Sequence, residues 1–296
     1  MANLKEIRIR LNSVKSTRQI TSAMKMVSAA KLRKAQEAII QMRPFASKLQ
    51  EIQRSASAAV SNDASENVFL QPGVSDRVLL VVISSNRGLC GGFNSNVVKK
   101  TLSRISEKYL SENQGNKLDI LCLGKKGYDL LKSKRLSIKD SQHAILEKLT
   151  FEDSRKIADT LIGDFLSKKY RTIELIYNQF RNAAVQDVVA ESFLPLTVIA
   201  SPADETIKAL PNPIFEPSVE LLLDNLIPMA LRIQFHKALL DSLASDHGAR
   251  MTAMHKATDN ATDLIRDLEL TYNKARQASI TNELLEIVSG ANALNG

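Results

Sequence analysis

Apolar residues in the C-terminal quarter of the chain recur at alternating steps of three and four positions. Such a heptad repeat is typical of a helix that packs along its length against another helix. Between Pro228 and Gly290 only Gly248 interrupts a run of residues that favour helix. The pattern predicts a helix from about Val219 to Ser289, roughly 100 Å long, which no single small domain can bury. The predicted seam, the line of positions that faces a partner helix, is Leu222, Leu226, Met229, Ile233, His236, Leu240, Leu243, His247, Arg250, Met254, Ala257, Ala261, Leu264, Leu268, Thr271, Ala275, Ala278, Asn282 and Leu285.

The N-terminal segment carries a similar apolar pattern, and no Gly or Pro occurs in it before Pro44. It predicts a helix from about Leu4 to Ser57 that can pair antiparallel with the C-terminal helix of the same chain. Small residues from Ala257 onward allow close approach, and a shift in the pattern predicts an irregular supercoil. A second copy of the chain is the alternative partner for these helices. The expected N-terminal seam is Leu4, Ile7, Leu11 and Val14, followed by a shift to Ile20, Met24 and Val27.

The middle of the chain alternates between expected strands and helices. Val78–Ile83 is a short apolar run that ends at the glycine-rich turn Arg87–Phe93, and Leu118–Leu123 is a second such run. A helical stretch from about Ser95 to Tyr109 lies between the two runs, and units of this kind are typical of parallel sheets. A second unit has expected helices around Gly127–Lys134 and Ser154–Lys169 and expected strands Thr172–Tyr177 and Val188–Leu196.

The expected fold is mixed α and β: a long antiparallel coiled coil of N- and C-terminal helices with an inserted Rossmann-like α/β domain. We expect residues 1–57 and 218–296 to form one discontinuous coiled-coil domain, and residues 76–200 to form the α/β domain. Two linkers separate them. Ser55–Ser75 is rich in Ser, Ala and Asn, and Ser201–Pro217 holds four of the eight prolines.

Charge separates the two ends of the chain. Residues 1–54 contain twelve basic and three acidic side chains, a net charge of +9, whereas residues 220–296 contain seven basic and ten acidic ones, a net charge of −3. The whole chain has a net charge of +8. Opposite charges at the two ends favour pairing within one chain over pairing between two copies.

Composition excludes several classes of protein. The 296 residues, 44% hydrophobic and 24% charged, are those of a folded chain rather than a disordered one. No window approaches the ~18 consecutive apolar residues of a membrane span, and the charged first ten residues lack the apolar core of a signal peptide. Cys90 and Cys122 are too few for a disulfide framework, which excludes a cysteine-stapled secreted module and favours a reducing interior.

The turn Arg87–Phe93 is the first candidate for chemistry, because a glycine-rich loop before a helix can hold phosphate. Gly88, Gly91 and Gly92 lack the GxGxxG spacing, and no GxxxxGK[ST] motif occurs in the chain. We therefore favour a tight turn with a positive φ angle over a nucleotide site. Cys90 has no histidine near it in the sequence, so the pattern does not favour a nucleophilic thiol.

The histidines and the basic N-terminal segment do not indicate a further site. None of the histidines forms a metal-binding spacing such as HExxH, and a polar seam residue more often sets the register of a coiled coil. The basic segment lacks aromatic residues for base stacking and a Trp or Phe face for a membrane, so neither nucleic acid nor direct membrane binding is expected. The four histidines are His143, His236, His247 and His255, of which His236 and His247 lie on the expected seam.

The residues alone therefore predict two paired helices, a small α/β domain and no catalytic constellation. A protein of this kind transmits force or position, or it acts as a homodimeric coiled-coil scaffold.

Three motifs make the chain similar to the gamma subunit of F-type ATP synthases. They are Ile20–Lys31, Arg87–Asn94 and Tyr272–Ala291, and the resemblance extends from end to end of the chain. The last motif contains the family's signature, Ile280-Thr281-x-Glu283-x-x-Glu286-x-x-x-Gly290-Ala291.

The resemblance implies a non-catalytic rotor that couples transmembrane proton flow to ATP synthesis. It implies that the terminal helices turn inside a hexameric ring of alpha and beta subunits, while the α/β domain contacts the epsilon subunit and the ring of c subunits. Neither a cofactor nor a metal is implied. Because the chain begins at the helix, without a transit peptide or the extra cysteine pair of chloroplast relatives, we expect a bacterial subunit, peripheral at the cytoplasmic face of the inner membrane.

The resemblance also implies contact residues for the beta subunit. Met24 and Lys25 match the family's N-terminal contact position, and Arg276, Gln277 and Thr281 match the C-terminal contacts. Seam packing for Met24 and simple helix-surface exposure for Thr281 are the alternative interpretations. The chain departs from the usual pattern at two places, where Ser22 replaces a common Lys and Asn86 replaces a common Asp.

Overall fold

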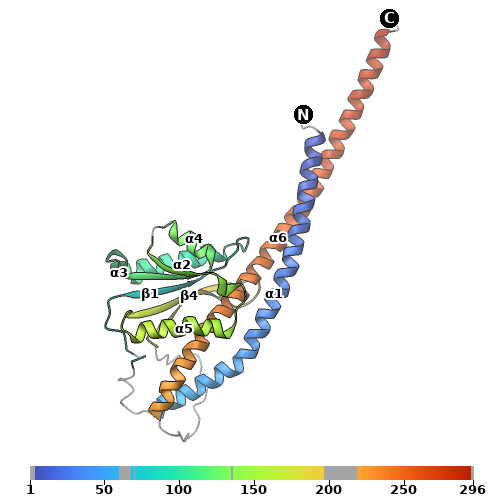
Figure 1. Cartoon of the computed structure of the whole chain (residues 1–296). Coiled ribbons are helices and arrows are strands. Elements are labelled where there is room, and N and C mark those ends of the chain that lie inside the picture. Colours follow the sequence, from blue (N-terminus) through green and yellow to red (C-terminus); the bar gives the residue numbers. More distant parts are fainter. Residues whose placement is uncertain (1–3, 60–67, 70, 135, 197–218, 295–296) are drawn as a thin grey trace. The chain divides into compact units, whose positions relative to one another are not determined.

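The computed structural model describes residues 4–59, 68–69, 71–134, 136–196 and 219–294 (Figure 1). It divides into two compact units, which we call the helix-pair unit (Met1–Ser28 with Met251–Gly296) and the sheet unit (Ala29–Arg250). Two long helices, α1 (Leu4–Ala59) and α6 (Val219–Leu294), contribute to both units. No described helix is both long and apolar enough to cross a membrane. The other elements are β1 (Val78–Ile83), α2 (Phe93–Lys108), α3 (Leu110–Gln114), β2 (Leu118–Leu123), α4 (Lys125–Lys132), β3 (Ile138–Gln142), the 3₁₀ helix η2 (Ala144–Leu146), α5 (Phe151–Leu166), β4 (Thr172–Phe180) and β5 (Gln186–Leu194).

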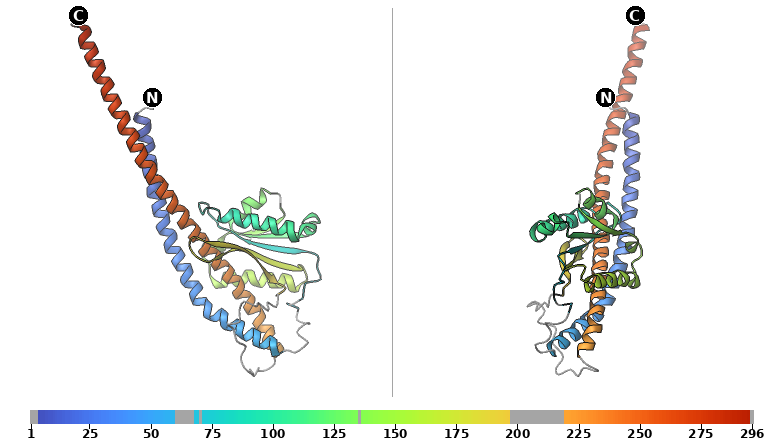
Figure 2. Two further views of the ribbon diagram at one scale, coloured as in Figure 1. Left: turned by 180° about the vertical axis from the view of Figure 1, so that it is seen from behind. Right: turned by 60° about the vertical axis from the view of Figure 1, so that its left-hand side comes forward.

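In the helix-pair unit α1 and α6 run side by side in opposite directions, as the heptad pattern predicts (Figure 2). Residue numbers that rise along α1 meet residue numbers that fall along α6. Three contacts fix this register: Lys15 Nζ lies 2.8 Å from Glu269 Oε1, the hydroxyl oxygens of Thr21 and Thr258 lie 2.9 Å apart, and Lys25 Nζ lies 3.2 Å from His255 Nδ1.

The seam of α1 continues without the shift that the apolar pattern predicts at Ile20. Ile20 and Val27 are 60% and 57% exposed, whereas Thr21 and Ser28 are buried. Small and polar side chains can occupy a helix seam when they find hydrogen-bond partners there, so the apolar residues in this stretch follow a different face. The seam positions after Val14, all in the same heptad step, are Arg18, Thr21, Lys25, Ser28, Leu32, Ala35 and Ile39.

In the helix-pair unit, α6 buries some of the predicted seam positions, but at others the buried residue is the next one along the chain. Met254 and Ala261 are buried as predicted, but Ile265 is 6% exposed where the predicted Leu264 is 38% exposed. A heptad alternates steps of three and four, and either Leu264 or Ile265 satisfies it. Both residues are apolar, so only the position of the partner helix distinguishes them.

In the sheet unit α6 is buried on more than one side. Leu231, Phe235 and Leu239 belong to the core of the sheet, while Ile233 and Leu240 lie near Met42 of α1. The predicted seam describes only the second of these faces. A helix that is covered on two sides carries more buried positions than a coiled-coil seam.

The sheet has the strand order β3-β2-β1-β4-β5. The predicted strands Val78–Ile83 (β1) and Leu118–Leu123 (β2) are confirmed with the same ends. β1 lies at the centre of the sheet and pairs in parallel with both β2 and β4. One feature differs from a purely parallel sheet: β5 pairs antiparallel with β4 through a short hairpin. β3 pairs in parallel with β2 at the edge of the sheet, and its polar sequence gives no apolar signal.

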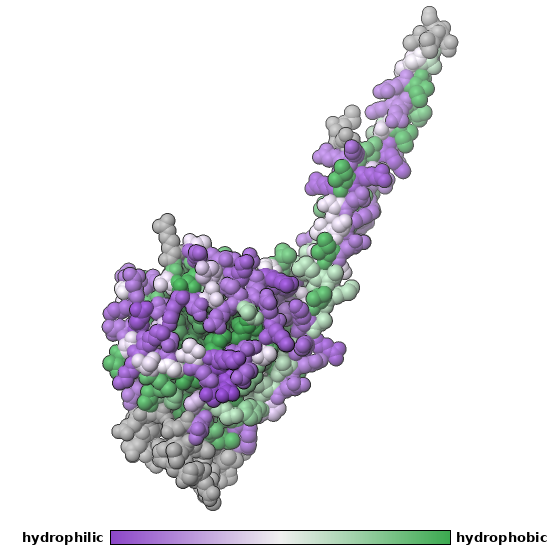
Figure 3. All heavy atoms as spheres, in the orientation of Figure 1, coloured by the Kyte–Doolittle hydropathy of each residue, from purple (hydrophilic) through white to green (hydrophobic). Residues whose placement is uncertain are grey.

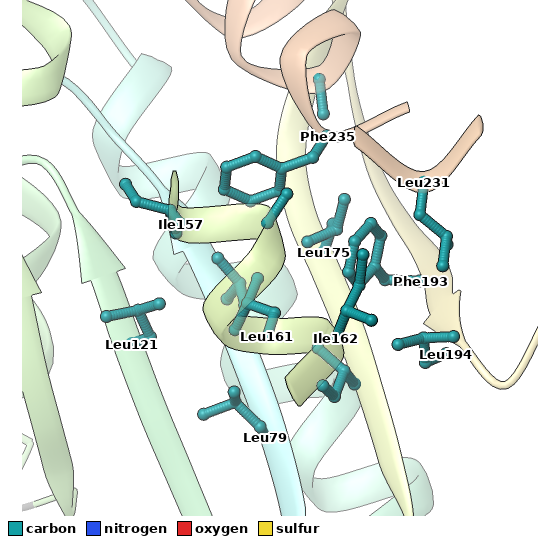
Figure 4. Close-up of a cluster of buried hydrophobic side chains, with 14 of the residues drawn as sticks. Leu79, Leu121, Ile157, Leu161, Ile162, Leu175, Phe193, Leu194, Leu231 and Phe235 are labelled. Atoms are coloured by element: carbon teal, nitrogen blue, oxygen red, sulfur yellow. The ribbon is translucent and has the colours of Figure 1, made fainter. Parts of the chain in front are cut away.

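Both faces of the sheet are covered, which explains why its central strands are continuous apolar runs. α2 and α4 cover one face, where Val78, Leu80 and Val82 of β1 point. α5 and α6 cover the other face, where Leu79 and Val81 point. Figure 4 shows this second core, in which Phe235 and Leu231 of α6 meet Leu175 of β4, Phe193 of β5 and Leu161 of α5.

Candidate functional site

The C-terminal end of α6 is exposed on all sides. Every described side chain from Ile280 to Asn292 is exposed to solvent. Lys15 of α1 lies beside Glu269, and the described part of α1 reaches Leu4, roughly three turns farther along. The exposed tip is nevertheless apolar, because Leu284, Leu285, Ile287 and Val288 lie within it, as the green atoms near the end of the helix indicate (Figure 3).

Arg276, Gln277 and Thr281 lie just before and at the start of this tip. All three side chains are exposed, and α6 is a regular helix through them. Gln277 and Thr281 are four residues apart and share one face, where the Thr281 hydroxyl donates a hydrogen bond to the Gln277 carbonyl at 3.0 Å. The guanidinium of Arg276 and the amide of Gln277 therefore stand as two neighbouring polar groups at the edge of an apolar tip.

Met24 and Lys25 lie in a different environment. Both side chains are half-buried, and the Lys25 ammonium is within hydrogen-bond distance of His255 on α6. His255 also lies 3.4 Å from the carboxylate of Asp259 on its own helix. Lys25 is thus a seam residue as well as a candidate contact.

The structure does not bring the two groups of candidate residues together. Lys25 lies beside His255, and Arg276 is 21 positions farther along α6, a distance of about 30 Å along the helix. Two separate contact points on one helix pair are suited to a partner, or several partners, of large extent.

Sequence reasoning missed an apolar stripe on the outer side of α1. Ile9, Ile20 and Val27 are each more than half exposed. Their spacings of eleven and seven residues are close to whole numbers of helical turns, so they lie on one face. The apolar pattern contains this signal, but it predicts Ile20 and Val27 to lie in the seam rather than on an exposed face. Next to this stripe, a shallow groove of about 530 Å³ is lined by Arg18, Gln19, Ser22, Ala23, Met26, Thr258 and Thr262.

Backbone conformation and packing within the sheet unit explain the residues of the glycine-rich turn. Gly91 has φ +60, the positive value expected there. Cys90 is buried beside Ser85 and Asn94, whose side-chain amide lies 3.2 Å from the sulfur. Burial raises the pKa of the Cys90 thiol, which disfavours the reactive thiolate. Burial also raises the pKa of Cys122, to about 12.

The histidines do not combine into a metal site. In the part of the chain that the structure describes, no three His, Cys, Asp or Glu side chains are grouped to hold a metal ion. His236 lies in the sheet unit with Nδ1 2.8 Å from the Ser154 hydroxyl, and its ring stands edge-on to Phe151. Burial lowers the pKa of both His236 and His247.

Comparison with protein families gives a match over nearly the whole chain. The family model described as ATP synthase matches residues 3–294. The chain is 55% identical to the ATP synthase gamma chain of Flavobacterium johnsoniae over 296 residues, and the match covers all of both chains. It is 46% identical to the ATP synthase gamma chain of Cytophaga hutchinsonii and 43% identical to that of Geobacter metallireducens, again over the full length of each.

Solved structures with a similar fold come from central stalks and rotors. The central stalk of Tetrahymena thermophila mitochondrial ATP synthase has a TM-score of 0.55 at 25% identity, with 80% of this chain and 99% of that chain covered. The rotor of Euglena gracilis mitochondrial ATP synthase has a TM-score of 0.64 at 22% identity, with 94% and 98% covered. At 22% identity, the similarity to the Euglena gracilis rotor concerns the fold alone.

Proposed function

This chain belongs to the ATP synthase gamma-chain family, and on that premise we propose how it works as a rotor. As a gamma chain it is a non-catalytic subunit of the central stalk, so its contribution to ATP synthesis is mechanical. A homodimeric scaffold is not favoured, because the family accounts for the full length of the chain.

The exposed apolar tip of α6 carries the proposal. Leu284, Leu285, Ile287 and Val288 lie within an arc of about 160° on one face of the helix, and this apolar face is costly to leave in water. A partner must therefore cover it. We infer that the tip turns inside the ring formed by the alpha and beta subunits, so that the apolar face meets one subunit after another.

Polar residues beside the tip supply contacts that depend on direction. Arg276 offers a planar fork of donors suited to carboxylates, and Gln277 offers both a donor and an acceptor. We propose that these two residues with Thr281 contact beta subunits, and that Met24 and Lys25 form a second contact about 30 Å along the helix pair. The net charge of +9 in residues 1–54 favours acidic partner loops.

The asymmetry of the helix pair lets its orientation change the conformations of the surrounding subunits. Two helices with different side chains present a different surface in each direction, so each catalytic subunit around them meets different contacts. A contact that differs between conformations shifts the populations of those conformations. Rotation of the pair therefore changes in turn which beta subunit binds, converts or releases nucleotide.

The sheet unit has a different role in the proposed mechanism. We propose that it contacts the epsilon subunit and the ring of c subunits, and that proton flow through the membrane part of the complex turns it. The chain itself would then be a peripheral component, held through the complex at the cytoplasmic face of a bacterial inner membrane.

Reconstitution tests the proposal. The purified chain is mixed with its own alpha and beta subunits, and the assembly is isolated and observed with an optical probe on the sheet unit during ATP hydrolysis. Because Cys90 and Cys122 are both buried, a Ser106→Cys variant offers an exposed thiol on α2 for selective attachment. We expect stepwise rotation that requires ATP. A stable chain that never assembles with alpha and beta at any salt concentration would contradict the proposal.

A further inference from the structure

Two loops of the sheet meet one short stretch of α6, Asp246–Arg250, within the sheet unit. The first loop is the turn Arg87–Gly92 between β1 and α2. The second is the hairpin between β4 and β5, where Ala183 lies against Gly248. The middle of this stretch, Gly248, is 13 residues, roughly 20 Å, along the helix from Phe235 in the apolar contact between α6 and the sheet.

Arg250 makes the contact to the first loop. Its guanidinium donates hydrogen bonds to the carbonyl oxygen of Gly88 and, at 3.4 Å, to that of Arg87. One turn earlier on the same helix, the Asp246 carboxylate accepts from the guanidinium with both oxygens, at 2.6 and 2.9 Å. Arg250 is only 8% exposed. The nearby Asp246 carboxylate balances its charge, and the carbonyl oxygens of Gly88 and Arg87 accept from the rest of its guanidinium.

The turn that Arg250 holds is strained. Leu89, between Gly88 and Cys90, has φ +65, a conformation that side-chain-bearing residues rarely adopt. Its side chain is 65% exposed, so packing of that side chain does not hold it there. Such conformations persist only where the surroundings impose them. Here the Ser85 hydroxyl donates to the Arg87 carbonyl at 2.6 Å from inside the turn, and Arg250 donates to the same carbonyl from α6.

The second loop packs closely because position 248 has no side chain. A Cβ atom there would lie 3.3 Å from both the Cα and the carbonyl oxygen of Ala183, and 3.5 Å from the Phe180 ring. Gly248, one of the two glycines of α6, therefore has a local reason. It lets the hairpin approach the backbone of α6 beside the Arg250 contact.

Resting on the rotor role proposed above, we propose that Arg250 is a positioning residue that locks the sheet to α6 against rotation. Near Phe235 α6 is joined to the sheet unit by apolar packing and by polar contacts such as Arg232 with Asp159 and Gln234 with Glu191. The hydrogen bonds from the buried guanidinium of Arg250 add a second attachment farther along the helix that fixes direction as well as distance. Two attachments separated along one helix resist swivelling better than one. Because α6 is one continuous helix as far as Leu294, torque on the sheet is transmitted to this helix.

The experiment measures angular fluctuation in the assembled complex of this chain with its alpha and beta subunits. A probe is attached either to Ser106→Cys on α2 or to Lys237→Cys on the exposed side of α6, and its angular variance is recorded while rotation is stalled. For Arg250→Gln we expect the variance at position 106 to increase about twofold, because the directional contact to the turn between β1 and α2 is lost while the contacts near Phe235 remain. We expect the variance at position 237 and the rate of ATP hydrolysis to stay unchanged.

Arg232→Lys is the matched control. Arg232 also joins α6 to the sheet unit, but through an ion pair with Asp159 that lysine can keep, and it contacts no loop carbonyl in the described structure. It should leave both variances unchanged. Arg250→Lys retains the charge opposite Asp246 and loses the fork, so an intermediate increase at position 106 is expected.

Unchanged variance at position 106 in assembled Arg250→Gln would overturn the inference, as would an equal increase at both probe positions. If Arg250→Gln does not assemble, Arg250→Lys decides by the same comparison, and failure of both to assemble would also overturn a role limited to angular positioning. Failure of the unaltered chain to rotate would instead contradict the proposed function.

Discussion

Lys25 of α1 and His255 of α6 face each other across the helix pair, with the lysine Nζ 3.2 Å from the imidazole Nδ1. An ammonium group has donors only, so this contact requires a free lone pair on Nδ1. The pair joins the two terminal regions of the chain, 230 residues apart in sequence.

Replacing His255 by lysine should weaken the helix pair. His255→Lys places two ammonium groups together, whereas His255→Gln keeps an acceptor. We expect His255→Lys to lower the free energy of unfolding by about 0.5–1 kcal/mol, the range for partly exposed pairs, and His255→Gln to change it less. Urea unfolding of the isolated chain, followed by circular dichroism, measures both. Equal stability of the two variants would show that the Lys25 contact contributes nothing.

Loss of the polar groups beside the tip of α6 should impair coupling. We expect Arg276→Ala and Gln277→Ala each to reduce the ATPase turnover of the reconstituted complex several-fold, with about 1–3 kcal/mol lost from contacts to the ring. Stability of the isolated chain should not change, because both side chains are exposed. Lys274→Ala, an exposed change one turn away, is the control. Normal turnover in both variants would remove these residues from the contact surface.

The buried carboxylate of Glu174 should make the sheet unit sensitive to acid. Burial alone raises its pKa, but hydrogen bonds from Arg104, Lys108 and Tyr109 together outweigh burial and hold the pKa below the ordinary 4.5. A lowered carboxyl pKa contributes stability that is present above pH 4.5 and is lost as the pH falls below it.

Glu174→Gln should therefore destabilise the chain at neutral pH by about 2–3 kcal/mol, the range for charge-assisted hydrogen bonds, and reduce the loss of stability in acid. Thermal unfolding between pH 3 and pH 7 provides the measurement. Glu107→Gln, an exposed change on α2, should have less than about 0.5 kcal/mol of effect. A Glu174→Gln profile parallel to that of the unaltered chain would contradict the assignment.

Two histidines should add a separate pH dependence. Burial lowers the pKa of His236 and of His247 below 6.5, with Lys31 and Arg250 lowering that of His247 further and Asp246 opposing them. The unfolded chain takes up these protons at a higher pH than the folded chain does. Stability is therefore full above pH 6.5 and decreases as the pH falls below it.

The double variant His236→Asn, His247→Asn should flatten this decrease. Denaturant unfolding at pH 7.5, 6.5 and 5.5 follows it, and Thr262→Asn, an exposed change on α6 that removes no titratable group, is the control. A slope that persists in the double variant would mean that other groups titrate in this range.

Local patterns determined the helices and the central strands. Val78–Ile83 and Leu118–Leu123 are uniformly apolar because both faces of the sheet are covered, and that signal needs no knowledge of the partners. The long terminal helices followed in the same way from helix-favouring residues without Gly or Pro. The candidate contacts at Arg276, Gln277 and Thr281 came only from resemblance, since an exposed polar residue carries no local sign of what it will bind.

Tertiary structure decided whatever depends on a partner distant in sequence. The heptad pattern permitted either Leu264 or Ile265 in the seam, and the position of α1 selected Ile265. Hydroxyl contacts such as Thr21 with Thr258 place polar residues in a seam that apolar counting assigns to Ile20. β3 has no apolar run because it lies at an edge. Arg250 also gave no sign in the sequence of its bond to Gly88, because the two residues meet only after the sheet has packed on α6.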